Sequence, residues 1–128
     1  MMGDLIGEFK GKNTTYRVLP DGNIETSGQG TGKILGIDAF IMFTTVATTT
    51  TGVFVGEGNG LITTMNGEKV IMKMDSISWQ SEKGGVTRGA SYQMTDSEKL
   101  MRLNKVIGLH ELETDEMGNW TGKIWEWK

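Results

Sequence analysis

The chain of 128 residues contains no cysteine, one proline and one histidine, and these scarcities exclude several kinds of site. Without cysteine there can be no disulfide, no thiolate metal site and no cysteine nucleophile. One histidine, His110, cannot form a histidine-rich zinc site, so we expect no metal and no cofactor. Small secreted domains are commonly cross-linked by disulfides, so the absence of cysteine favours a cytoplasmic protein.

The chain also lacks long apolar runs and a large excess of charge of one sign. No run of about 18 apolar residues occurs, which is the length a membrane-spanning helix needs, and the first residues lack the pattern of a signal peptide. The net charge is -3 at pH 7, and acidic and basic residues are interspersed. Nucleic-acid-binding domains normally present a basic face. We therefore expect neither nucleic acid nor a membrane as a partner.

Glycine, by contrast, is abundant, with 19 residues spread along the chain. No segment has the composition of a linker, and the length suits one domain with its own core, so we expect a single domain over residues 1–128. Glycine falls on every second residue in two rows, Gly28 to Gly32 and Gly56 to Gly60. In an extended strand each row would lie on one face. Such rows indicate strong bending or close backbone approach.

A phosphate-binding loop is the alternative interpretation of these rows. A dinucleotide site would need a helix immediately after the glycines, so that its amino end could meet the phosphates. Lys33-Ile34-Leu35 follows the first row and Leu61-Ile62-Thr63 follows the second. Both segments have the composition of strands, so the rows favour sheet curvature over phosphate binding.

Turn signals divide the rest of the chain into strands. Pro20-Asp21-Gly22-Asn23 is typical of a tight turn, and Asn66-Gly67 between two apolar runs is a strong hairpin signal. About eight or nine strands follow one another as a meander. Closing such a sheet removes its unpaired edges. The sequence therefore predicts an all-β protein, a single antiparallel closed β-barrel.

One segment departs from the strand pattern. Thr95-Asp96-Ser97-Glu98 matches a capping box, and Leu100, Met101 and Leu103 follow at helical spacing. The spacing predicts a short helix over residues 96–103. A lone helix of this length is marginal in water, so we expect it to pack against the sheet or to plug one end of the barrel.

With these features placed, the chain resembles the small barrels related to allene oxide cyclase and dirigent proteins, a group with prokaryotic members of unassigned function. The resemblance rests on Gly7-Glu8-Phe9-Lys10-Gly11, the first glycine row with Gly36 after it, the Pro-Asp-Gly turn and the closing Trp120 to Trp125 strand. It implies an eight-stranded antiparallel barrel with an apolar-lined cavity, often in an oligomer. No catalytic residue of that group aligns with a position here, so the resemblance carries over no activity.

Two residues are weak candidates for catalysis. His110 has a side chain whose ordinary pKa lies near neutrality, so it is the first candidate for a general base. Glu111 and Glu113, on the opposite strand face, rank after it. A structural histidine without chemistry is the alternative. Asp75 shares a strand face with apolar neighbours, where enclosure would raise its pKa. It could equally pair with Lys73 on the same face.

Methionine and tryptophan are the residues most suggestive of binding. The chain has nine methionines and four tryptophans, and methionine supplies adaptable apolar surface. Plain core packing is one interpretation, and an apolar pocket with a few polar contacts is the other. The expected ligand-binding residues are Tyr16, Met72, Met74, Trp79, Arg88, Tyr92 and His110.

Three functions remain open at this point. The first is a soluble barrel that binds a small apolar or amphipathic molecule in its interior, without being an enzyme. The second is a small-molecule cyclase or isomerase on the same barrel. The third is a non-catalytic assembly protein with a filled barrel. Interface cores are enriched in tryptophan and methionine, so a homo-oligomer is expected alongside any of them.

Overall fold

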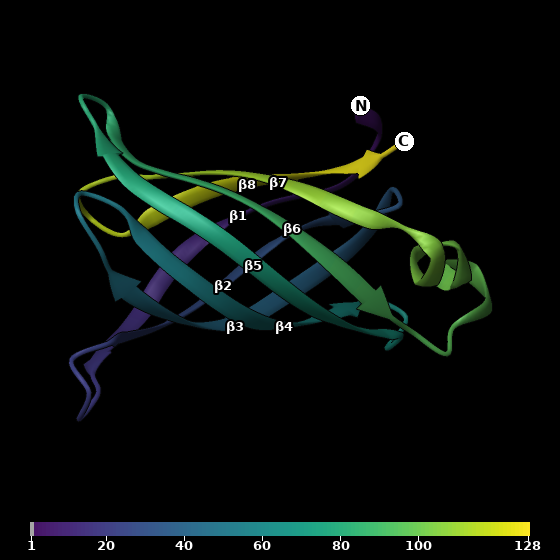
Figure 1. Cartoon of the computed structure of the whole chain (residues 1–128). Helices are drawn as coiled ribbons and strands as arrows, with labels where there is room; N and C mark the ends of the chain where they lie inside the picture. The colour runs from purple at the N-terminus through teal and green to yellow at the C-terminus, as the bar shows by residue number, and fades with distance from the viewer. Residues whose placement is uncertain (1) are drawn as a thin grey trace.

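The computed structural model describes residues 2–128 as a closed barrel of eight antiparallel strands with one short helix (Figure 1). Each strand pairs with the next along the chain, and β8 pairs with β1 to close the sheet. This confirms the predicted fold class and meander order. The elements are β1 (Met2–Val18), β2 (Ile24–Ile34), β3 (Ile37–Thr49), β4 (Phe54–Thr64), β5 (Lys69–Ser81), β6 (Gly84–Met94), the 3-10 helix η1 (Glu98–Lys105), β7 (Ile107–Thr114) and β8 (Asn119–Trp127).

The two ends of the barrel are built differently. The end that carries η1 also holds both ends of the described chain, as Figure 1 shows. At the opposite end the strands are joined by the β1–β2, β3–β4, β5–β6 and β7–β8 hairpins. Gly22 and Gly118, in two of those hairpins, have φ angles of 88° and 82°, which a turn of this kind requires of glycine. The Asn66-Gly67 hairpin lies at the η1 end and also has a glycine with positive φ, 82°.

Both glycine rows face the inside of the barrel. A Cβ atom on Gly11 would collide with the backbone of Gln29, and one on Gly32 would collide with the backbone of Glu8. Strands β1 and β2 thus approach each other so tightly that no side chain fits at these glycine positions on the inner face. The rows therefore mark close backbone approach in a strongly coiled sheet, as the sequence predicts.

Part of the hydrophobic core lies at the end of the barrel that carries η1. Its fully buried side chains are Ile6, Ile34, Ile62, Val70, Leu100 and Leu103. The last two belong to η1, so the helix inserts its apolar face into the barrel end. This confirms one of the two expected roles of the helix, that of a plug.

The helix itself differs from the prediction in type, bounds and cap. It is a 3-10 helix from Glu98 to Lys105, and Ser97, not Thr95, precedes it as N-cap without a side-chain cap bond. The Thr95 hydroxyl instead donates to the carbonyl of Lys69, at 2.8 Å, on the neighbouring hairpin. The same hydroxyl accepts a hydrogen bond from the backbone N–H of Ser97 at 3.1 Å, so Thr95 ties the residue before the helix to β5 and does not act as the N-cap.

Within residues 2–128, no helix has the length and apolar character needed to cross a bilayer.

Candidate functional site in the barrel interior

An internal cavity of about 330 Å³ occupies the barrel between the η1 plug and the hairpin end. It falls at the lower limit of the volumes found for small-molecule sites. Side chains or backbone from all eight strands line it, because alternate residues of every strand point inward. Eight strands enclose an interior that either fills with side chains or holds one small ligand. In this chain, space for a ligand remains.

The cavity wall changes in character along the barrel axis. Toward the plug it is buried and apolar, with Phe9, Ile41 and Met72 each 5% exposed or less. Toward the hairpin end the lining side chains are half-buried and many carry a hydroxyl: Thr26, Thr45, Ser76, Ser78, Thr87 and Thr114. Tyr16 stands at this end and is 61% exposed. The cavity thus has an apolar floor and a polar mouth.

His110 is the buried titratable group on the cavity wall. It is 4% exposed, and its Nε2 lies 2.6 Å from the hydroxyl of Ser91. Ser91 in turn accepts a hydrogen bond of 2.5 Å from the side-chain amide of Gln93. Burial lowers the pKa of His110 from its ordinary 6.5 to about 4, because the charged imidazolium would lose its hydration. The ring is therefore neutral near pH 7.

The structure brings four of the residues predicted for the site to the cavity. Met72 and Met74 on β5 and His110 on β7 line its wall, and Tyr16 on β1 stands at the mouth. They come from three strands that are remote in the sequence, and barrel closure alone brings them together.

The remaining predicted residues point to the outer face. Asp75, Trp79, Arg88 and Tyr92 do not line the cavity. The physical reason is the two-residue period of a strand, which places Asp75 outward beside the inward Met74. Asp75 is exposed, so the enclosed carboxylate considered above does not form. Of the residues predicted for the site, only Tyr16, Met72, Met74 and His110 line the cavity.

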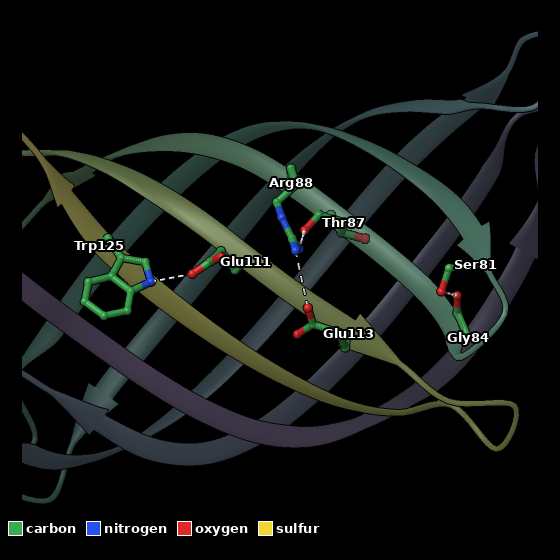
Figure 2. Close-up of polar contacts among 7 residues, drawn as sticks. All are labelled: Ser81, Gly84, Thr87, Arg88, Glu111, Glu113 and Trp125. Atoms are coloured by element: carbon green, nitrogen blue, oxygen red, sulfur yellow. Dashed lines mark hydrogen bonds and ion pairs between the residues drawn. The ribbon is translucent and has the colours of Figure 1, made fainter. Parts of the chain in front are cut away.

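Figure 2 shows part of this outer surface over β6, β7 and β8. The Arg88 guanidinium donates to the carbonyl of Thr87 at 2.9 Å and lies 3.4 Å from a carboxylate oxygen of Glu113. Nearby, the Trp125 indole donates to Glu111 at 2.6 Å. Glu111 and Glu113 thus make surface contacts on the side of β7 opposite His110, as the strand period predicts.

Sequence reasoning missed Ser91 and Gln93, which are 3% and 4% exposed. Their only local signal is the period itself, since both occupy the inward positions of β6. A buried serine or glutamine is uncommon enough to indicate a specific contact. The contact becomes visible only when β7 is paired with β6, which sets Gly108 opposite Ser91. A Cβ on Gly108 would come within 2.8 Å of the Ser91 hydroxyl, so this glycine leaves room for the polar chain.

A metal site is not apparent in the described part of the chain, where no three histidine, cysteine or acidic side chains come together.

Comparison with known proteins places the chain by its fold alone. No protein-family model and no curated protein matches it. Solved structures that are similar include a conserved protein of unknown function from Rhodopseudomonas palustris, with a TM-score of 0.81, 9% identity, and coverage of 98% of this chain and 97% of that one.

Two further solved structures give the same result. A protein of unknown function from Clostridium acetobutylicum has a TM-score of 0.81 at 8% identity, with 98% of each chain covered. A beta-barrel like protein from Acinetobacter baumannii has a TM-score of 0.77 at 11% identity, with 97% of this chain and 94% of that one covered. These likenesses show that the chain shares its β-barrel fold with these three proteins.

Proposed function

We propose that this barrel binds a small apolar or amphipathic molecule in its interior. The observation that carries the proposal is the cavity of about 330 Å³ with an apolar floor and a hydroxyl-rich mouth. Such a site favours a ligand whose apolar body lies toward the plug and whose polar part lies at the hairpin end. Burying the apolar body would supply most of the affinity, because each Å² of apolar surface removed from water contributes about 25 cal/mol.

The test begins with native mass spectrometry of protein purified from its own host, followed by denaturation and identification of released compounds. A variant that fills the cavity shows whether the compound is bound there. Ser76 points into the cavity and is flanked by Gly56 and Gly89 on the neighbouring strands, so Ser76→Phe can project a ring into the space. Ile77→Phe is the matched control, because Ile77 is the next residue and is 47% exposed on the outer face.

The expected result is a stoichiometric apolar compound in the wild type and in Ile77→Phe, and its loss in Ser76→Phe. A compound retained equally by both variants would place the ligand elsewhere and contradict the proposal. A wild-type protein that carries no compound and binds no apolar probe would contradict it as well.

A second candidate function is a cyclase or isomerase of the kind found in the allene oxide cyclase group. The observation that favours it is that His110 borders the cavity and is hydrogen-bonded to a second polar group, Ser91. Its pKa of about 4 makes it a weak base, which argues for binding over proton abstraction. Incubating the released compound with fresh wild-type protein and with His110→Gln tests this directly. Conversion by the wild type only would support catalysis.

We also propose that the barrel forms a homo-oligomer through its outer face. Met42, Leu61, Ile71 and Met94 lie side by side across β3, β4, β5 and β6, pointing outward. Exposed fractions of 50%, 48% and 43% for Met42, Ile71 and Met94 make this row an apolar patch of the kind that interfaces cover. Sedimentation should show a single oligomer that Ile71→Lys dissociates. Thr31→Lys, on the outer face of β2, is the matched control.

A further inference from the structure

The hydrogen-bonded side chains of Gln93, Ser91 and His110 form a polar chain beside the cavity, and this chain determines which ring nitrogen of His110 carries the proton. The amide Nε2 of Gln93 donates to the Ser91 oxygen at 2.5 Å, so that oxygen already serves as an acceptor. The hydroxyl of Ser91 still has one hydrogen to donate, and His110 Nε2, at 2.6 Å, is the atom placed to accept it. Hydrogen donation therefore runs in one direction, from Gln93 through Ser91 to His110.

The opposite arrangement would be costly. If Nε2 carried the proton, Ser91 would accept from both neighbours, and its own O–H would be left without an acceptor while 3% exposed. A buried donor without a partner is strongly unfavourable. A neutral imidazole has one donor and one acceptor nitrogen. With Nε2 as the acceptor, the ring proton must lie on Nδ1.

That Nδ1–H has no acceptor in the described protein. Every hydrogen bond of the ring within residues 2–128 runs through Nε2 to Ser91, and the ring borders the cavity. Two other polar side-chain atoms in the described chain lack a partner and are fully enclosed, Gln93 Oε1 and Trp120 Nε1. His110 Nδ1 is not among these enclosed atoms, so it keeps some accessible surface. The donor is thus left for a molecule in the cavity, where the surrounding Leu112 and Ile124 side chains cannot accept a hydrogen bond.

We infer that the cavity selects ligands bearing a hydrogen-bond-accepting oxygen, such as a carbonyl, at the position that meets His110 Nδ1–H. This inference rests on the proposed binding function and makes it specific for a chemical class. In it, His110 contacts the ligand, and Ser91 and Gln93 are positioning residues that hold the tautomer. A pure hydrocarbon would leave the donor unpaired and bind less well.

The test compares two probes of nearly the same shape, 2-acetylnaphthalene, which has a carbonyl, and 2-isopropenylnaphthalene, which has a methylene in its place. The wild type should bind the ketone about three- to tenfold more tightly, the range expected for one net hydrogen bond. His110→Phe should abolish this preference while still binding both probes. Ser91→Ala should weaken the preference, and Ser91→Thr, which keeps the hydroxyl, should restore it.

A second readout requires no substitution. Because His110 is the only histidine, nitrogen-15 NMR of the ring reports its tautomer without ambiguity. We expect the proton on Nδ1 in the wild type and a change in the tautomer signals in Ser91→Ala, which a merely structural serine would not produce. A proton on Nε2 in the wild type would overturn the inference.

The outcomes separate the inference from the proposed function. If both probes bind with equal affinity, the cavity binds small molecules and the acceptor preference is refuted. If neither probe binds at any accessible concentration, both the inference and the binding function on which it rests are contradicted.

Discussion

The ring of Phe43 meets the indole of Trp120 edge-on inside the barrel, with centroids 5.4 Å apart and ring planes at 71°. Both rings lie over the first glycine row. A Cβ on Gly28 would collide with the Phe43 ring at 2.5 Å, and one on Gly30 would lie 2.8 Å from Cζ2 of Trp120. The glycines of β2 therefore do two things at once, since they let β1 approach closely and they leave space for two aromatic rings on the cavity wall.

The first prediction concerns this glycine row. Gly30→Ala should lower the free energy of unfolding by about 1–3 kcal/mol, the usual cost of overpacking, because the added methyl meets both the Lys10 backbone and the Trp120 ring. Chemical denaturation provides the measurement. Thr31→Val, on the exposed side of the same strand, is the control and should stay within about 0.5 kcal/mol of wild type. Equal stability of the two variants would mean that the strand relaxes to accept a side chain.

The second prediction concerns the plug. Leu103 of η1 is fully buried, so Leu103→Ala should cost about 2–5 kcal/mol, the range for removing a large core side chain. Lys99→Ala, on the exposed side of the same helix, is the matched control and should change little. Thermal unfolding of both variants checks this. A small effect of Leu103→Ala would show that the helix contributes little to closing the barrel.

The third prediction is a pH dependence. The pKa of His110 is about 4 in the folded protein and 6.5 in an unfolded chain, so the unfolded state binds more protons between these values. Stability from this group is fully present above pH 6.5 and is lost as the pH falls toward 4, by about 3 kcal/mol at most. The side chains paired with it or packed beside it, Ser91 and Ile124, do not titrate in this range.

Denaturation at several pH values, for wild type and His110→Gln, isolates the contribution of His110. The glutamine does not titrate, so the variant should lose less stability between pH 6.5 and 4. A proton NMR titration of the single histidine measures its pKa independently. A value near 6.5 would contradict the burial seen in the structure.

The fourth prediction separates the inner face from the outer face. Arg88→Ala and Tyr92→Phe alter outward side chains, so neither should change the affinity for 2-acetylnaphthalene in calorimetry. Arg88→Ala should also cost less than about 1 kcal/mol of stability, because its ion pair with Glu113 is solvent-exposed. Met72→Ala enlarges the cavity floor and should change the affinity. Loss of binding in Arg88→Ala alone would move the site to the outer surface.

Much of the strand geometry followed from local pattern. The period of two correctly grouped His110 with Gly108 and Leu112, and it set Trp120 apart from Trp125 and Trp127. It also grouped Asp75 with Ile77 and Trp79, and that whole group faces outward. The pattern did not tell which face of each strand points into the barrel and which points to solvent. Trp79, Arg88 and Tyr92 were expected at the site because aromatic and polar side chains suit a binding pocket, and the sequence does not tell which face of a strand points inward.

The sequence by itself determined the barrel, its turns and the alignment of each glycine row on one strand face, because these depend on backbone alternation and on where glycine removes a side chain. Only the tertiary structure decided that the interior is hollow and that His110 meets Ser91, 19 residues away. Strand alternation is a property of neighbouring residues along one chain. Cavity volume and the joining of β6 to β7 depend instead on how the closed sheet coils, and this is set by all eight strands together.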